Sequence, residues 1–428
     1  MKQIIHISPH LGGGVGTVLL NYLSKSKNNK KYNHSMYCLD TINTKAKNIL
    51  LHNKIHFDES MYNKHSKLLE IIADSDIVII HWWNHPLLYE FIVKNTLPLS
   101  RVAIWSHVSG IQVPNIFTHT LFNYADYFVF STPMSYLIKE VTNYKGNPDK
   151  LKDVWSTGGL DHISKIIKKE HEGFNVGYIG TVDYSKMHPN FINMCARIDI
   201  PNIKFIVCGS GHIDKLQKEV KEKGLEKKFI FTGFIENISA YLEIFDVFGY
   251  PLNPKHYGTC DQTLAEAMGC GIVPIVLNNN MEKYMVHNMY SGIVAKDEQE
   301  YVDAIEKIYI NKKLKNRLEI RSKEEAFRRF SIEDTIKNWE IIFDELLDKI
   351  KTKKKWRGSY HGEDVKPYQI FLESIGEYAE LFEKNDIPKI TNLINSSDNW
   401  KSKTKGSCNH YNYFFDDIKL KEWSRLSE

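Results

Sequence analysis

The sequence lacks the paired cysteines that mark a disulfide scaffold or a structural zinc site. Its six cysteines are scattered along the chain, no two are spaced as Cys-x-x-Cys, and most lie in apolar runs. We therefore expect reduced thiols, as in a cytosolic protein. No other group of residues with the spacing of metal ligands stands out, so neither a metal nor another cofactor is expected.

An excess of charge of one sign and long hydrophobic runs are also lacking. The formal net charge is only +4 over 428 residues, so the balance does not indicate a nucleic-acid partner. The first residues, MKQIIHISPHLGGGVGT, hold a short apolar run interrupted by His, Pro and Gly, which is not the pattern of a signal peptide. No run reaches the roughly 20 apolar residues that cross a bilayer. We expect a cytoplasmic protein, and association with the inner face of the plasma membrane stays open.

The length of the chain indicates two or three domains. Short apolar runs alternate with helical patterns over 1–165 and again over 174–330, which predicts an α/β protein with parallel, doubly wound sheets. A helix is expected over 331–350, and residues 351–428 are interpreted as a C-terminal extension packed on the core, with a helix over Pro367–Glu383. The predicted strands are Gln3–Ile7, His34–Leu39, Ile77–Ile80, Val102–Trp105 and Tyr127–Phe130, then Asn175–Ile179, Lys204–Cys208, Phe229–Phe231, Val247–Tyr250 and Ile272–Val276.

The most informative segment is residues 257–276, YGTCDQTLAEAMGCGIVPIV. It indicates a polar loop, a helix over Gln262–Met268, a break at two glycines and a buried strand. A loop that opens onto a helix directs backbone N–H groups and the positive end of the helix dipole at its contents, which suits a diphosphate. Glu266, one turn into the helix, is placed to accept hydrogen bonds from ribose hydroxyls. The alternative is an ordinary helix with one solvated Glu.

This segment resembles the nucleotide-sugar motif of retaining glycosyltransferases with the GT-B fold, glycosyltransferase family 4 in particular. That motif is Glu, seven residues, Glu, then Ala-Met-x-x-Gly-x-Pro-Val. Here Glu266 matches the second Glu, whereas Gly258 stands at the position of the first. The resemblance covers roughly residues 1–350 and is strongest over 174–290. The matching residues that follow the second Glu are Ala267, Met268, Gly271, Pro274 and Ile275.

The resemblance implies a GT-B architecture, with two Rossmann-like domains facing each other across a cleft. It also implies a glycosyltransferase that moves a sugar from a nucleoside-diphosphate donor, with UDP favoured, to a glycan or lipid-linked acceptor. Transfer is expected to retain the anomeric configuration and to need no metal. Because the first Glu of the motif touches the donor sugar, Gly258 bears on sugar identity and stereochemistry. A GT-B sugar-nucleotide epimerase and a non-catalytic nucleotide-binding subunit are the alternatives.

Several further loops are expected to surround the donor. Gly13 and Gly14 follow the first strand and let the backbone approach a ligand closely, although the third glycine of a dinucleotide fingerprint is missing. The resemblance places Lys186 on the diphosphate and puts Thr181 where the family usually has Arg. The whole predicted donor set is Gly13, Gly14, Gly180, Thr181, Gly209, Gly211, Phe234, Gly258, Thr259, Cys260, Asp261 and Glu266.

Histidines and tryptophans end two consecutive strands of the first domain. His81 lies in HWWNHP and His107 in WSHVSG; His107 aligns with a family His that contacts the donor sugar, while the alternative is a structural role for both. Aromatic faces beside them would stack on sugar rings or apolar tails. The predicted catalytic residues are His107, Lys186 and Glu266, and the predicted acceptor-binding residues are His81, Trp82 and Trp83.

Two basic clusters raise the question of peripheral membrane contact. They are Lys25–Lys31 and Lys351–Lys355, and each Lys near an anionic surface contributes about 1 kcal/mol. Solvated charge runs are the alternative. The aromatic residues of the extension are expected to pack on the core instead, namely Trp400, Tyr413, Phe414 and Trp423. The high Lys, Asn and Ile content suits a bacterium with an AT-rich genome, which favours a cell-surface glycan as product.

Overall fold

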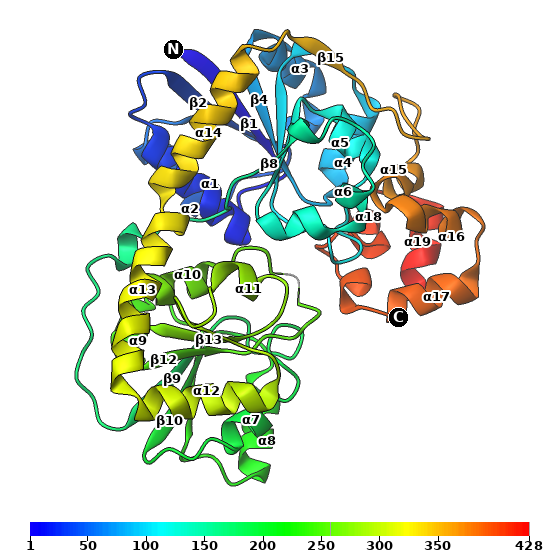
Figure 1. Cartoon of the computed structure of the whole chain (residues 1–428). Helices are drawn as coiled ribbons and strands as arrows, with labels where there is room; N and C mark the ends of the chain where they lie inside the picture. Colours follow the sequence, from blue (N-terminus) through cyan, green and yellow to red (C-terminus); the bar gives the residue numbers. More distant parts are fainter. Residues whose placement is uncertain (257, 428) are drawn as a thin grey trace. The chain divides into compact units, whose positions relative to one another are not determined.

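The computed structural model describes residues 1–256 and 258–427. The chain forms two compact units (Figure 1). Unit 1 comprises residues 1–158 together with 335–428, and unit 2 comprises residues 159–334. Each unit has its own parallel sheet with helices around it.

The connection between the units differs from the sequence-based boundary at residue 165. The structure divides the chain after Gly158, and Leu160 and Ile163 are already buried in unit 2. A Cβ placed on Gly269 would lie 2.8 Å from Cδ1 of Ile163. The apolar side chains of the connection therefore belong to the second core.

Unit 1 is built on a seven-stranded sheet in the order β3-β2-β1-β4-β6-β7-β8. All of its strand pairs are parallel, and its central strands are buried on both faces, as in doubly wound sheets. The strands are β1 (Lys2–Ser8), β2 (Tyr32–Cys38), β3 (His56–Asp58), β4 (Ile77–Trp82), β6 (Val102–Ser106), β7 (Tyr127–Phe130) and β8 (Leu151–Asp153). The accompanying helices are α1 (Gly13–Ser26), α2 (Thr44–His52), α3 (His65–Asp74), α4 (Pro86–Lys94), α5 (His119–Tyr124) and α6 (Lys139–Thr142).

Unit 2 holds a six-stranded parallel sheet in the order β11-β10-β9-β12-β13-β14. The strand order reverses between β9 and β12, and ligands of open α/β sheets bind at such a point. The strands are β9 (Phe174–Ile179), β10 (Ile203–Cys208), β11 (Phe229–Gly233), β12 (Val247–Tyr250), β13 (Val273–Leu277) and β14 (Ile293–Ala295). The helices are α7 (Phe191–Ala196), α8 (Ile213–Glu222), α9 (Ser239–Leu242), α10 (Gln262–Gly269), α11 (Glu282–Met285), α12 (Glu298–Ile310) and α13 (Lys312–Phe330).

The ten predicted strands are confirmed, with ends that differ by at most two residues. The predicted helix over 331–350 is also confirmed as α14 (Ile332–Leu347). Its Trp339 packs on Trp105 of β6 with ring centroids 5.0 Å apart, so this helix covers the sheet of unit 1. None of the helices in the described part of the chain has the length and apolar character that spanning a bilayer requires.

The C-terminal extension is part of unit 1. Its strand β15 (Thr352–Lys354) pairs antiparallel with β5 (Leu97–Ser100), and helices α15 and α18 lie against α4. The predicted single helix over Pro367–Glu383 is wrong, because the chain turns at Gly376, where φ is +53°. The helices of the extension are α15 (Pro367–Ser374), α16 (Ala379–Glu383), α17 (Ile387–Asn395), α18 (Cys408–Phe414) and α19 (Ile418–Arg425).

Most of the aromatic residues predicted to pack on the core do so. Trp400 and Trp423 are buried, and Phe414 is partly buried against the same core. Tyr413 does not follow, because 74% of its side chain is exposed. Three of the four predicted contacts thus anchor the extension to unit 1.

Candidate functional site

The glycine loops at the carboxyl ends of β9, β10 and β11 interlock. The amide of Gly180 donates to the carbonyl of Cys208 at 3.0 Å, and the amide of Gly209 donates to the carbonyl of Gly233 at 2.9 Å. Gly209 has φ +138°, and a Cβ there would lie 1.8 Å from the carbonyl oxygen of Gly180. A side chain at this position would break the contact between the loops.

Two neighbouring residues complete this edge of the sheet. Gly211 has φ +151°, and a Cβ on it would meet the carbonyl oxygen of Val182 at 2.5 Å. Thr181 uses its carbonyl to accept a hydrogen bond from the Tyr178 hydroxyl at 2.9 Å. Phe234 follows β11 and is 74% exposed, so its ring is open to a stacking partner. The predicted loop residues of unit 2 therefore share one edge of the sheet.

Lys186 is paired with Asp261, the residue before α10. The ammonium lies 2.9 Å from Oδ1 of Asp261, with both side chains about 15% exposed. The Tyr250 hydroxyl donates to Oδ2 of the same carboxylate at 3.1 Å. Burial by itself would raise the pKa of Asp261, but the Lys186 charge, with His256 and these hydrogen bonds, holds it below its usual value. A fixed cation therefore lies at the N-terminal end of α10.

Glu266 is buried one turn into α10. Its Oε1 lies 2.8 Å from Nε2 of His162 and accepts a hydrogen bond from the Gln262 amide at 3.1 Å. The hydrogen bond to Glu266 raises the pKa of His162, although burial opposes this. His162 and Gln262 therefore hold the carboxylate of Glu266 in place. A carboxylate can accept several hydrogen bonds, as the binding of hydroxyl groups requires. Sequence reasoning missed His162, because it lies 104 residues away in the connection between the units.

The loop that contains Gly258 is supported by a buried pair that the sequence did not indicate. Nδ1 of His256 accepts from the Gly258 amide at 3.0 Å, and Nε2 of the same ring lies 3.2 Å from Glu282. A Cβ on Gly258 would lie 3.4 Å from Oδ2 of Asp261. Asp261 therefore places its carboxylate beside the position of the missing family Glu.

Thr259 and Cys260 lie in the same loop and are half-buried. Burial, followed by the neighbouring Asp261 charge, raises the pKa of the Cys260 thiol to about 12. The thiol is protonated near neutral pH and is not an activated nucleophile. Any contact of Cys260 with a donor is therefore that of a neutral group or of its backbone.

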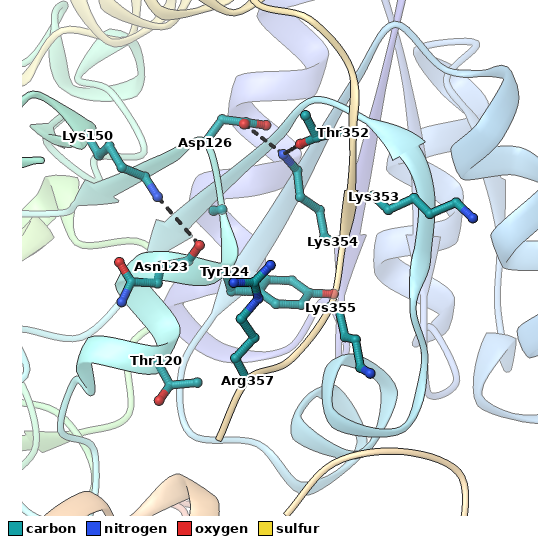
Figure 2. A pocket seen from close by; sticks show the side chains of 11 residues that line it. Thr120, Asn123, Tyr124, Asp126, Lys150, Thr352, Lys353, Lys354, Lys355 and Arg357 are labelled. Atoms are coloured by element: carbon teal, nitrogen blue, oxygen red, sulfur yellow. Dashed lines mark hydrogen bonds and ion pairs between the residues drawn. The ribbon is translucent and has the colours of Figure 1, made fainter. Parts of the chain in front are cut away.

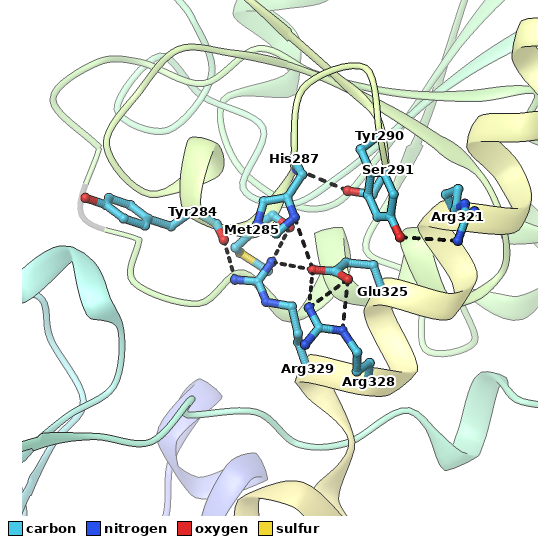
Figure 3. A network of polar contacts seen from close by, with 9 residues as sticks. All are labelled: Tyr284, Met285, His287, Tyr290, Ser291, Arg321, Glu325, Arg328 and Arg329. Atoms are coloured by element: carbon cyan, nitrogen blue, oxygen red, sulfur yellow. Dashed lines mark hydrogen bonds and ion pairs between the residues drawn. The ribbon is translucent and has the colours of Figure 1, made fainter.

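A partly buried arginine holds the segment after β13 in place (Figure 3). Arg329, at the end of α13, donates to the carbonyls of Tyr284 and Met285, the second at 3.1 Å. It also pairs with Glu325 at 3.3 Å. Nδ1 of His287 lies 3.3 Å from the same Glu325 oxygen. Helix α13 therefore fixes α11 and the turn that follows it.

Four histidines form a continuous hydrogen-bonded chain in unit 1. His34, His6, His81 and His107 come from β2, β1, β4 and the end of β6, which are neighbours in that order in the sheet. Successive ring nitrogens are 2.9, 2.9 and 3.0 Å apart. Nδ1 of His107 then lies 3.0 Å from the Ser156 hydroxyl. A neutral imidazole carries one N–H, so all four rings must share the same tautomer, Nδ1–H or Nε2–H.

This chain changes the interpretation of His107. Both of its ring nitrogens are engaged inside unit 1, one by His81 and one by Ser156. Burial lowers the pKa of His107 to about 3, so the ring is neutral near pH 7. The predicted catalytic role then reduces to that of a neutral donor or acceptor, and it requires one of these hydrogen bonds to open.

The predicted acceptor residues do not all reach the surface. Trp82 is instead a core residue, since its indole is fully buried and packs on Phe117 with ring centroids 5.3 Å apart. His81 is also fully buried and reaches the strand ends only through His107. Trp83 is 8% exposed and contacts His107 with ring centroids 6.4 Å apart. His81 and Trp82 are adjacent on β4, and successive side chains of a strand point to opposite faces of the sheet. His81 therefore joins the histidine chain, whereas Trp82 packs on the other face.

The glycine-rich loop of unit 1 opens α1. Gly13 has φ +63°, and a Cβ on Gly13 or Gly14 would meet nothing within 4 Å. Nδ1 of His10 accepts a hydrogen bond from the Gly12 amide at 3.0 Å. The backbone at these two glycines is thus uncovered by other parts of the described chain and is available to a ligand.

Comparison with known proteins identifies the second unit. Residues 161–325 match the family of glycosyl transferases group 1, and this range lies within unit 2. No curated protein sequence matches the chain.

Solved structures match about four fifths of the chain, including residues of both units. HepE of Anabaena in complex with UDP-glucose is 14% identical, with a TM-score of 0.62 over 81% of this chain and 100% of HepE. WaaB, a lipopolysaccharide outer core galactosyltransferase in its apo form, is 18% identical, with a TM-score of 0.61 over 80% and 99%. TarM of S. aureus is 11% identical, with a TM-score of 0.64 over 82% and 99%. These likenesses show that the chain has the GT-B fold of two Rossmann-like domains, as the sequence predicted.

Proposed function

We propose that this glycosyltransferase, whose residues 161–325 match the family of glycosyl transferases group 1, transfers a sugar from a UDP-sugar to a glycan or lipid-linked acceptor. One observation carries this proposal. Lys186 is fixed at the N-terminal end of α10, and Glu266 lies one turn further on the same helix. A cation and a helix N-terminus suit the diphosphate, and the carboxylate suits the ribose hydroxyls.

The proposed chemistry needs charge stabilisation at the leaving group. As the bond between the anomeric carbon and the diphosphate breaks, negative charge grows on the phosphate oxygens. Lys186 and the backbone N–H groups of residues 259–261 would stabilise that charge without a metal. Asp261 would exchange its contact with Lys186 for one with the sugar, because its carboxylate lies beside position 258. We propose retention of configuration through an oxocarbenium-like transition state.

The donor and the acceptor class are supported by the structural relatives. HepE has been solved with UDP-glucose, and TarM with UDP and an α-GlcNAc-glycerol. WaaB acts as a galactosyltransferase of the lipopolysaccharide outer core. These relatives support UDP as carrier and a cell-surface glycan as acceptor. We propose further that the protein works in the cytoplasm, with peripheral contact to the membrane that carries a lipid-linked acceptor.

Calorimetric titration with UDP tests the donor site. Replacing Lys186→Met should weaken UDP binding by roughly 10- to 100-fold, because one charge-assisted contact is worth about 1.5–3 kcal/mol. Glu266→Gln should weaken binding of UDP more than that of pyrophosphate, which has no ribose. Lys218→Met, on the exposed face of α8, is the matched control. Equal affinities in Lys186→Met and the control would contradict the site.

Product analysis tests the reaction itself. UDP-sugars are incubated with and without a panel of glycan and lipid-linked acceptors, and the sugar products are followed. Transfer only in the presence of an acceptor supports the proposal. Conversion of the donor sugar without acceptor would instead indicate an epimerase, and UDP binding without turnover would indicate a non-catalytic subunit.

A further inference from the structure

A hollow of about 540 Å³ lies in unit 1, and all of the residues that line it belong to that unit. Figure 2 shows the side chains that line it, which come from the end of α5, the segment before β8, and β15 with the residues after it. The residues that line it include five cations and one carboxylate. The cations are Lys150, Lys353, Lys354, Lys355 and Arg357, and the carboxylate is Asp126. The charge gathered around this one hollow equals the net charge of the whole chain, +4.

The single carboxylate is already used by the buried cation. Nζ of Lys354 lies 2.7 Å from Oδ1 of Asp126 and 2.6 Å from the Thr352 hydroxyl. Oδ2 of Asp126 accepts from the Val102 amide at 2.8 Å. Both oxygens are therefore engaged, one by Lys354 of β15 and one by the backbone of β6, and among the described residues Asp126 forms no ion pair with the other four cations.

Those four cations lack a carboxylate partner among the described residues. Lys150 is half-buried, and its Nζ has only a 3.5 Å contact with the carbonyl of Asn123. Burial, with repulsion from Lys354 and Lys349, lowers the pKa of Lys150, although the charge of Asp126 opposes this. Lys353, Lys355 and Arg357 are exposed along the same wall, and a bound anion would supply the partner of opposite charge that the described residues do not give them.

A buried donor without a partner among the described residues also lies in the wall. The Tyr124 side chain lines the hollow and is 4% exposed. Its hydroxyl has no hydrogen-bond partner in the described part of the chain. Buried hydroxyls are usually paired, so this hydroxyl is an unsatisfied donor within the wall of the hollow.

A second hollow of about 290 Å³ adjoins the first and shares Thr120 and Arg357 with it. Its wall is different, because Ser359, Tyr360 and Glu383 supply hydroxyl and carboxylate groups rather than further cations. The Tyr360 hydroxyl donates to Oε1 of Glu383 at 2.8 Å. Groups of this kind bind hydroxylated, uncharged parts of a ligand. The two hollows together suit a ligand with an anionic end and a hydroxyl-rich neighbour.

We propose that the hollow formed by Lys150, Lys353, Lys355 and Arg357 is a phosphate-binding site, separate from the donor site, that holds a phosphate carrying a hydroxylated group. The phosphate belongs either to a soluble ligand or to the headgroup of an anionic lipid, and both present the same chemistry. The site lies entirely within unit 1 and does not rest on the proposed transferase function. A ligand bound there would be held by unit 1, whereas the proposed donor loops belong to unit 2.

The test compares a triple variant with a control of equal charge. Lys353→Gln, Lys355→Gln and Arg357→Gln together remove three of the four cations. Lys218→Gln, Lys221→Gln and Lys223→Gln on α8 and its C-terminal end remove three charges from unit 2. Every protein also carries Lys186→Met, so that pyrophosphate binding at the donor loops is weakened in all samples. Thermal melts followed by tryptophan fluorescence show that unit 1 is folded in each variant.

In the soluble arm of the test, calorimetric titration with pyrophosphate measures binding of a free phosphate ligand. In the lipid arm, co-sedimentation with vesicles of phosphatidylcholine, with and without 30% phosphatidylglycerol, measures binding to an anionic headgroup. We expect at least a 10-fold loss of binding in the triple variant, in one arm or in both, and less than a 3-fold change in the control. The arm in which the loss occurs identifies the source of the phosphate. Absence of binding in both arms, or equal losses in variant and control, would overturn the proposal.

Discussion

Acidification should unfold unit 1 well before its carboxylates titrate. Burial lowers the pKa of every histidine in the hydrogen-bonded chain, to about 4 for His34, about 3 for His107, and well below 6.5 for the two between them. The same holds for His85 and His410, which stack edge to face at 4.9 Å. These six rings are neutral in the folded protein and gain protons in the unfolded chain once the pH falls below about 6.5.

The sign and size of the effect follow from proton binding. Between the folded pKa values and about 6.5 the unfolded chain binds more protons, so the free energy of unfolding rises with pH in this window and falls on acidification. At pH 5, about 1.5 units below the unfolded value, each ring costs about 2 kcal/mol, and six cost about 12 kcal/mol. This is comparable with the whole stability of a domain, about 5–15 kcal/mol. Unfolding is therefore expected between pH 6 and pH 5.

Tryptophan fluorescence isolates this transition. All eight tryptophans lie in unit 1, namely Trp82, Trp83, Trp105, Trp155, Trp339, Trp356, Trp400 and Trp423, so their emission reports this unit alone. The melting temperature should fall steeply from pH 6.5 to pH 5. Replacing His6→Gln puts a donor and an acceptor that do not titrate at this position. The number of protons taken up on unfolding should then fall by about one, and the melting temperature should depend less steeply on pH. A melting temperature that stays constant from pH 7.5 to pH 5 would refute the reasoning.

Three further predictions concern unit 2. Asp261→Asn should tighten UDP binding by about 5- to 10-fold, since it removes a negative charge beside the diphosphate, an effect of about 1 kcal/mol. The same substitution should reduce the extra affinity that a UDP-sugar has over UDP. Calorimetry with both ligands measures the two effects. Gly209→Ala should destabilise unit 2 by about 3 kcal/mol or more, whereas Gly224→Ala, where φ is +66° and space is open, should cost only about 1 kcal/mol; urea unfolding followed by circular dichroism compares them, and equal costs would contradict the clash. Arg329→Met should weaken UDP binding and destabilise unit 2 by about 2–3 kcal/mol, while Arg328→Met, whose side chain is 66% exposed, should change the urea midpoint little.

The sequence predicted the long strands because their apolar runs are continuous. Strands β3 and β8 were not predicted, because each has only three residues, which leave no periodic signal. They are His56–Asp58 and Leu151–Asp153. Strand β15 escaped for another reason. Its sequence is a lysine run, and the fold makes it a strand by pairing it with β5 and by burying Lys354 against Asp126.

The candidate site was predictable where it is local and hidden where it is not. Glu266 and the glycine loops lie in short motifs that the sequence alone singles out, and Asp261 lies in the same segment as Glu266. His162 and Glu282 reach Glu266 and His256 only through tertiary folding, so no spacing reveals them. The histidine chain needed the strand order, since His6 and His81 are 75 residues apart in sequence and adjacent in the sheet.

The prediction that Trp82 binds the acceptor did not account for the direction in which its side chain points. The sequence showed a tryptophan at a strand end beside His81, but alternation turns its ring to the face opposite from the histidine chain. Its indole lies among Phe117, Tyr89 and Phe128 in the core. Which of two adjacent residues faces the core depends on strand register, which a motif of this length does not contain.

The return of the chain to unit 1 after residue 334 has a consequence for biosynthesis. Unit 2 is complete once its last helix, α13, has been made, whereas unit 1 still lacks α14 and the extension. Trp339 and Trp356 are fully buried there, so the first sheet exposes apolar surface on the ribosome until these residues emerge. The domain encoded first is therefore finished last, and truncation near the C-terminus should leave a folded nucleotide domain attached to an aggregation-prone partner.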